Sequence, residues 1–352
     1  MKIEMMIEGS MVIVGLDKTV IGIEYPKLPK PDEQNPITQE LIAQVNADKN
    51  EFVSNMKHIE SMIKIGPHYV SHTKNKDLKR YKVLSEIDGG LLCIFSLGFS
   101  FGTAVINFEI NPSRLTPGKW DELLGLLSVM FNDHYDEIYT KGVLAHAEFC
   151  IDVSGEDLSD LVLIDKGRRA YTRFKGTTYL GRRKSHLSTV MYDKSKEQKQ
   201  EGNLVRIEAR LSDRTIRVPD LVETDLFNPF SNCLVVDVNQ LHSASIALKN
   251  PALPNMIREL GLAGAVANKY ARQSILSYLE ENAAPWWKPT LYWAAHRELL
   301  QKLKPSQIES LTQSADSPQV SVTMAVTRCK YVLVTPHNNA YEKADIPETY
   351  CP

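Results

Sequence analysis

A tyrosine and a glutamate near the middle of the chain could together carry out phosphoryl transfer. Tyr192 lies in residues 187–194, where β-branched and aromatic residues predict a strand. A second predicted strand, Leu204–Leu211, alternates polar with apolar residues and carries Glu208 on its polar face. The polar segment between the two strands ends in Gly-Asn, so we expect a hairpin with a long loop. In such a hairpin Tyr192 and Glu208 can face one site, from which a phosphodiester could be attacked.

Lys194 is the third candidate for this chemistry. Val190, Tyr192 and Lys194 should project to one face of the strand, because strand side chains alternate with period two. A phenol loses its proton only near pH ~10, so it is a weak nucleophile at neutral pH. A neighbouring ammonium group would favour the phenolate and stabilise the charge that develops on the phosphate. A strand tyrosine by itself more often packs in a sheet, but the lysine and the glutamate favour a catalytic role for Tyr192.

A third polar stretch, LAHAEFCIDVS, supplies further carboxylates. It lies in an expected strand at residues 143–153, where period two places His146, Glu148 and Asp152 on one face. Two carboxylates and an imidazole could bind a hard divalent cation, although an edge strand with a hydrated polar face would have the same pattern. Together with the hairpin glutamate, they predict a divalent-cation site formed by Glu148, Asp152 and Glu208, with His146 as an optional ligand.

Basic residues are concentrated around the hairpin. Residues 166–217 contain fifteen Lys and Arg against five Asp and Glu, a local excess of ten, whereas the whole chain has a net charge of −2. Such a concentration indicates phosphate binding, although a solvated charged face would have the same composition. The residues expected to contact DNA are Arg182, Arg183, Lys184, Lys196, Arg206 and Arg210.

Strands and helices alternate along the part of the chain that carries these residues. Strands are expected in residues 1–25, 81–110, 143–153, 170–175 and 177–180, and helices in residues 38–65 and 116–139. An uncharged run at residues 89–107 is long enough to span a membrane, but small and polar residues interrupt it, which favours buried sheet. The predicted fold class is α+β, with a mixed, mainly antiparallel central sheet flanked by helices.

The pattern changes after about residue 219, where a smaller, mainly helical region is expected to begin. Residues 257–281, 289–304 and 306–313 are predicted helices. A chain of 352 residues suits two domains, which we place at 1–225, with the candidate site, and at 226–352. Trp286 and Trp287 could stack on nucleic-acid bases, but the preferred interpretation is that they anchor the C-terminal helices.

Several functional classes are disfavoured by the sequence. The five cysteines are scattered without a C-x-x-C pair, which argues against a cysteine zinc site or a disulfide framework. Signatures of Ser/His/Asp hydrolases, P-loops and dinucleotide-binding motifs are absent. The first ten residues lack the apolar core of a signal peptide. We therefore expect a cytoplasmic protein without a membrane partner.

Four blocks, taken in order, resemble the rolling-circle replication initiators, most closely the nicking proteins of filamentous phages and also the Rep-type tyrosine endonucleases of plasmids. The blocks are FEINPSRL, HAEFCID, TTYLGRRKS with VMYDKSKE, and LVRIEARL. In this resemblance Tyr192 and Lys194 match the nicking tyrosine and the lysine two residues later, and Glu208 matches a strand glutamate. The acid strand departs from the family, since His146 stands where arginine is usual and Glu148 where aspartate is usual.

The resemblance implies a metal-dependent, site-specific nickase of origin DNA. Tyr192 would become linked to the 5′ phosphate, free a 3′ hydroxyl that primes rolling-circle replication, and later allow the strand to be rejoined. The implied cofactor is Mg²⁺ or Mn²⁺. The implied partners are single-stranded or supercoiled origin DNA and the helicase and polymerase of a bacterial host. A catalytically silent DNA-binding regulator and a related relaxase or transposase remain as alternatives.

Overall fold

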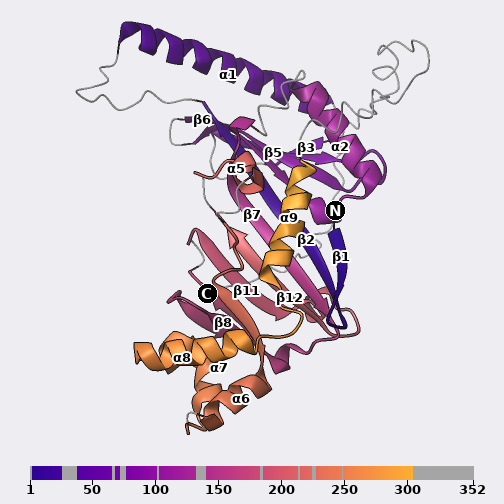
Figure 1. The fold of residues 1–352 in the computed structure, drawn as a ribbon. Helices are drawn as coiled ribbons and strands as arrows, with labels where there is room; N and C mark the ends of the chain where they lie inside the picture. Colours follow the sequence, from indigo (N-terminus) through magenta and orange to yellow (C-terminus); the bar gives the residue numbers. More distant parts are fainter. Residues whose placement is uncertain are drawn as a thin grey trace.

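The computed structural model describes residues 2–25, 38–65, 68–71, 77–100, 103–131, 140–182, 185–212, 215–223, 227–247 and 249–303. A large twisted sheet runs through the centre of the molecule (Figure 1). Its strands follow the order β3-β4-β5-β6-β2-β7-β12-β11-β10-β9, with β1 paired to β2. Every strand pairing among the described residues is antiparallel, and the predicted α+β class is confirmed.

The strands of the large sheet are β1 (Lys2–Ile7), β2 (Ser10–Glu24), β3 (His68–Ser71), β4 (Leu78–Leu84), β5 (Leu91–Ser100), β6 (Thr103–Ile110), β7 (Val143–Ser154), β9 (Tyr171–Phe174), β10 (Thr177–Leu180), β11 (Leu187–Asp193) and β12 (Leu204–Leu211). A second, two-stranded sheet pairs β8 (Leu161–Asp165) with β13 (Cys233–Asp237). The helices are α1 (Gln39–Ile65), α2 (Pro117–Met130), α4 (Lys194–Gln198), α5 (Val218–Glu223), α6 (Val238–Ala247), α7 (Leu253–Ala265), α8 (Lys269–Glu281) and α9 (Pro289–Gln301). Short 3₁₀ turns occur at Pro112–Arg114 and Leu158–Asp160.

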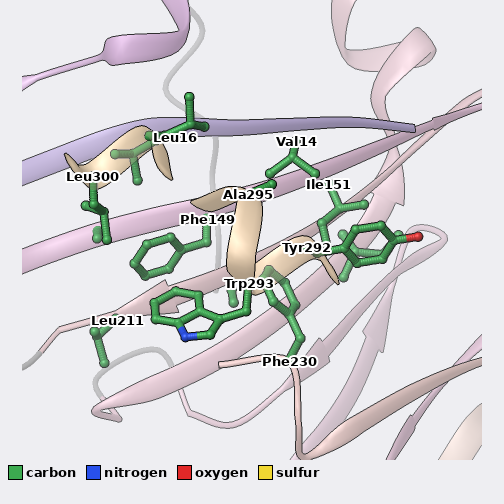
Figure 2. Packing of buried hydrophobic residues seen from close by; sticks show 14 of the residues in the cluster. Val14, Leu16, Phe149, Ile151, Leu211, Phe230, Tyr292, Trp293, Ala295 and Leu300 are labelled. Atoms are coloured by element: carbon green, nitrogen blue, oxygen red, sulfur yellow. The ribbon is translucent and has the colours of Figure 1, made fainter. Parts of the chain in front are cut away.

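One face of the large sheet forms the hydrophobic core beneath the helices. Helix α9 crosses β2 and β7, where the ring of Trp293 meets that of Phe149 edge to face with centroids 5.3 Å apart (Figure 2). Helix α1 lies over the other end of the same face, where the hydroxyl of Tyr81 donates to Glu60 at 2.5 Å. Near the outer strands, Tyr171 of β9 donates to the carbonyl of Arg258 in α7 at 2.6 Å. These contacts place apolar residues of alternating strand positions away from water.

The opposite face of the sheet carries the polar residues of β7 and β12. On β12, Val205, Ile207 and Ala209 are fully buried on the helix side, and the intervening Arg206, Glu208 and Arg210 point the other way. Directly opposed residues of antiparallel strands project to the same face. The pairs Arg206 with Asp152 and Arg210 with Glu148 therefore join the polar residues of both strands, as their alternation predicts.

Several expected elements differ from those in the structure. The expected helix at residues 257–281 is two helices, because Asn268 caps α8 by accepting from the backbone N–H groups of Tyr270 and Ala271. Strand β11 ends at Asp193, one residue earlier than expected, and α4 begins within the expected loop. Helix α2 ends at Met130, and residues 132–139 and 306–313, where helical structure was also expected, lie outside the described residues. None of the described helices is both long enough and apolar enough to cross a membrane.

Residues after 226 make close contacts with the rest of the molecule. Strand β13 pairs with β8, and α9 packs against β2. Trp286 and Trp287 are buried, which supports their interpretation as anchors of the C-terminal helices. A domain boundary near residue 225 remains a prediction.

Candidate active site

The phenol of Tyr192 is hydrogen-bonded to the carboxylate of Glu208. Its hydroxyl donates to Glu208 Oε2 at 3.3 Å, from the end of β11 to the neighbouring strand β12. The tyrosine is half-buried, whereas Glu208 is buried. Burial, and after it the charge of Glu208, raises the pKa of Tyr192 well above its usual value. The predicted pairing of tyrosine and glutamate is thus present, with the phenol protonated at neutral pH.

Lys194 lies near Tyr192, but it does not lie on the same strand as Tyr192, where it was expected. The strand has ended, and Lys194 is the first residue of α4, whose N-cap Asp193 accepts from the N–H of Lys196 at 2.9 Å. The side chain of Lys194 is buried, and its ammonium lies 5.7 Å from the centroid of the Tyr192 ring and pairs with Glu197. The ammonium therefore faces the ring of the tyrosine, and the short helix rather than strand periodicity places it there.

Arg206 and Asp152 form a buried ion pair, two residues along β12 from Glu208. The guanidinium binds both carboxylate oxygens, with Nη2 2.6 Å from Oδ2, and also pairs with Asp17 of β2. Arg206 is 4% exposed and Asp152 is 5% exposed. Burial by itself would raise the pKa of Asp17, but the charge of Arg206 and the hydrogen bonds from Ser113, Arg206 and Cys150 together hold that pKa below its usual value. Arg206, expected to contact DNA, is thus a buried group that holds two carboxylates together.

Asp17 is a site residue that the sequence did not predict. It lies in β2, a strand whose other residues are mostly apolar, at a bulge between Leu16 and Thr19. The bulge interrupts the alternation of side chains, so the period-two pattern does not predict the face of the sheet to which Asp17 projects. An isolated Asp-Lys pair inside an apolar strand was the available signal. The hydroxyl of Ser113, in the Asn-Pro-Ser-Arg turn, donates to the backbone of Leu16 at 3.0 Å and so secures this bulge.

Arg210 lies between Glu208 and Glu148. It pairs with Glu208, and its Nε is 3.9 Å from Glu148 Oε1. His146 Nε2 is 3.1 Å from the same glutamate oxygen, while its Nδ1 is 2.7 Å from the hydroxyl of Ser212. Burial first, with a contribution from Glu148, raises the pKa of Glu208 despite the opposing effect of Arg210. The Arg210 side chain is 38% exposed, so this residue is partly accessible from solvent.

Arg206 and Arg210 engage the carboxylates that were expected to bind a divalent cation. Within the described part of the chain, no three His, Cys, Asp or Glu side chains gather closely enough to hold a metal ion. The oxygens of Asp152 are bound by Arg206, while Arg210 occupies the space between Glu148 and Glu208. As arranged, these side chains do not fit a cation bound by all three carboxylates.

Two of the remaining predicted DNA contacts, Arg182 and Lys196, lie on the surface. Arg182 is exposed and follows Gly181, whose φ of 93° lets the chain turn sharply after β10. Arg183 and Lys184 lie outside the described residues. The Lys196 side chain is 85% exposed and its ammonium is 3.0 Å from Asp193. Arg182 and Lys196 are therefore accessible to a polyanion.

Comparisons with known proteins give a weak structural similarity. No family model and no curated protein matches this sequence. Among solved structures, the chain is similar to a rolling circle replication initiator protein from Geobacillus stearothermophilus. The match has 10% sequence identity and a TM-score of 0.34, and it covers 84% of this chain and 97% of the other. Identity and TM-score are both low, so this similarity does not identify the function of the chain.

Proposed function

We propose that this protein is a DNA nickase that initiates rolling-circle replication, with Tyr192 as its nucleophile. The observation that carries the proposal is the 3.3 Å hydrogen bond from the Tyr192 hydroxyl to Glu208. This pair lies on the polar face of the sheet, next to the partly exposed side chain of Arg210. A nucleophile, a proton acceptor and a phosphate-binding group are the parts that tyrosine-mediated strand cleavage requires.

In the proposed reaction, Tyr192 attacks a phosphodiester while Glu208 accepts the phenol proton. The phenol is protonated at rest, so its proton must leave as it attacks, and the Glu208 oxygen already accepts a hydrogen bond from it. The phenolic oxygen forms a bond to phosphorus while the bond from phosphorus to the 3′ oxygen breaks. The leaving 3′ oxygen takes up a proton and becomes a 3′ hydroxyl, and the 5′ phosphate remains on Tyr192 as an ester. Attack by a 3′ hydroxyl on that ester, with the proton transfers reversed, rejoins the strand.

Positive charge for the phosphate would come from Arg210. A guanidinium can donate two parallel hydrogen bonds to phosphate oxygens, and Glu148 and Glu208 hold this one at the site. The dependence on Mg²⁺ or Mn²⁺ that the resemblance implies stays a prediction, because the carboxylates expected to bind the cation are engaged by arginines. Origin DNA as substrate, and a host helicase and polymerase acting downstream, belong to the same proposal.

A catalytically silent DNA-binding regulator would show the same basic surface, so the proposal is tested at the nucleophile. Purified protein is incubated with supercoiled DNA that carries its own gene and flanking sequence, in buffer containing Mn²⁺. Mass spectrometry then maps any peptide linked to DNA. We expect the adduct on Tyr192, with nicking and adduct both lost in Tyr192→Phe. The control Tyr270→Phe, which removes the same oxygen from an exposed ring on α8, should nick normally.

An adduct on Tyr179, the nearest rival on the sheet, would mean that another tyrosine is the nucleophile. Full nicking by Tyr192→Phe would have the same meaning. DNA binding with neither a nick nor an adduct, on DNA shown to contain the origin, would favour the regulator.

A further inference from the structure

Aromatic side chains continue from Tyr192 across the polar face to the outer edge of the sheet. Tyr179 of β10 lies directly opposite Val190 of β11, and Val190 lies directly opposite Glu208. Opposed residues share a face, so Tyr179 projects to the same side of the sheet as Glu208 and Tyr192. Tyr179 is also the diagonal neighbour of Tyr192, since Val190 and Tyr192 are two residues apart on one strand.

Phe174 extends this face onto the edge strand β9. It lies opposite Thr177, which is two residues before Tyr179 on β10, so Phe174 and Tyr179 share a face. The Phe174 side chain is 41% exposed, although burial of a phenylalanine ring is strongly favourable. Lys175, which begins the turn to β10 with a φ of 49°, places its ammonium 5.3 Å from the centroid of the Phe174 ring. An exposed ring with a cation above it therefore lies at the sheet edge.

The helix that packs on these outer strands uses the other face. Tyr171 lies opposite Leu180, at strand positions that alternate with those of Phe174 and Tyr179. Tyr171 binds the α7 backbone, and Gly261 of α7 lies so close that an added Cβ would come within 2.7 Å of the Tyr171 ring. Helix α7 therefore packs on the Tyr171 side of β9, and Phe174 and Tyr179 project from the opposite side of the sheet.

We propose that Phe174 and Tyr179 form a stacking site for bases of single-stranded DNA, with Lys175 and Arg182 contacting its phosphates. Aromatic rings bind bases of any sequence through stacking, and neighbouring cations bind the backbone. Lys175 and Arg182 are both exposed, at the two ends of the β10 segment that carries Tyr179. The proposal rests on the proposed function in one respect, since it takes the stacked strand to be the one cut at Tyr192.

Binding is measured by the fluorescence anisotropy of a labelled oligo-dT of about 16 nucleotides, the upper range for one such site. Phe174→Ala and Tyr179→Ala should each weaken binding by about 5-fold to 150-fold, which corresponds to the loss of one stacked base. Phe174→Trp should bind at least as tightly as the wild type. The matched control Tyr270→Ala removes a ring that is 83% exposed elsewhere and should leave binding unchanged.

Wild-type affinity in both alanine variants would overturn the proposal, as would an equal loss of affinity for double-stranded DNA of the same length. Thermal unfolding of each variant shows whether the fold is retained, and Tyr179→Phe, which keeps the ring, should retain binding. The two proposals fail separately, because oligo-dT binding requires no cleavage. If binding depends on Phe174 but no adduct forms on Tyr192, the stacking site is supported and the nickase proposal is contradicted. If an adduct forms on Tyr192 but binding does not depend on Phe174, only the stacking-site proposal is contradicted.

Discussion

Two arginines on β12 determine the charge of the candidate site. Arg206 pairs with Asp152 and Asp17 inside the protein, and Arg210 pairs with Glu208 and Glu148 nearer the surface. Buried ion pairs seldom add much net stability, yet removing one partner leaves an uncompensated charge in a poorly solvated place. The two arginines therefore have different functions: Arg206 maintains the fold beneath the site, and Arg210 is available to a substrate.

Arg206→Met should destabilise the protein by about 3–5 kcal/mol, because Asp152 and Asp17 lose their buried partner. Chemical denaturation followed by circular dichroism measures this. The control Arg217→Met, which breaks an exposed pair with Asp220, should leave the midpoint almost unchanged. A shift for Arg206→Met no larger than that of the control would show that the buried network does not stabilise the fold.

Glu208→Gln should slow formation of the protein–DNA adduct by about 10²-fold to 10⁴-fold, the usual contribution of a positioned proton acceptor. The amide keeps the size of the side chain, so oligo-dT binding should be preserved. Single-turnover cleavage measures the rate, with Glu197→Gln, at the exposed partner of Lys194, as the control. An unaltered rate would show that Glu208 is not the proton acceptor in the reaction.

Arg210→Ala should strengthen the binding of Mn²⁺, because it frees Glu148 and Glu208 from a competing guanidinium. Isothermal titration calorimetry measures the affinity, and adduct formation with and without EDTA shows whether nicking requires the ion. Asp152→Asn should not change Mn²⁺ affinity, since Arg206 already binds that carboxylate. A loss of Mn²⁺ binding in Asp152→Asn would restore the site predicted from the sequence, in which all three carboxylates hold one ion.

At the scale of elements, α9 is fastened to the sheet directly behind the site. His296 is fully buried, and its Nε2 lies 3.1 Å from the Gly15 carbonyl oxygen of β2 and 3.2 Å from that of Cys150 in β7. Cys150 is the residue directly opposite Glu208, so the helix packs behind the strand position that carries Glu208. Burial lowers the pKa of His296 to about 4, which keeps the imidazole neutral in the folded protein.

This low pKa predicts a pH dependence of stability. The unfolded chain binds a proton at histidine near pH ~6.5, whereas folded His296 does not until about pH 4, so its stability contribution is lost as pH falls between these values. Wild-type unfolding free energy should therefore decrease more between pH 6.5 and pH 4 than that of His296→Gln, by about 3 kcal/mol. Parallel pH–stability profiles of the two proteins, from urea denaturation, would contradict the assignment.

At the scale of the whole molecule, charge is unevenly distributed. A chain of net charge −2 concentrates an excess of ten positive charges in residues 166–217, which include the outer strands and the hairpin. Within this segment Arg206 is buried and Lys194 is paired, so the charges that remain accessible include Lys175, Arg182 and Lys196. These accessible charges place the expected path of a nucleic acid at the β9–β11 end of the sheet.

Replacing Arg182, Arg183 and Lys184 together with alanine should flatten the salt dependence of single-stranded DNA binding. Each lost phosphate contact changes the slope of log affinity against log salt by about 0.7, so three contacts change it by about 2. Oligo-dT anisotropy at several NaCl concentrations measures the slope, with Lys57→Ala, on α1, as the control. An unchanged slope would place this turn away from the DNA.

The sequence by itself determined which residues share a strand face. Period-two alternation is a local property of the backbone, and it correctly put Arg206, Glu208 and Arg210 on one side of β12 and the apolar residues on the other. The α+β class and the position of α1 followed from equally local patterns. The local signal failed where a cap or a bulge interrupts it, as at Asp193 before Lys194.

Only the tertiary structure decided which charges meet. Arg206 binds Asp17, 189 residues earlier in the chain, because the strand order places β2, β7 and β12 side by side. The same order brings Arg210 between two glutamates, where the sequence predicted a shared cation. It also sets α9 behind the site, against strands from the other end of the chain. Strand order depends on packing between distant segments, so no window of sequence contains it, and it determines the partner of each ionised group.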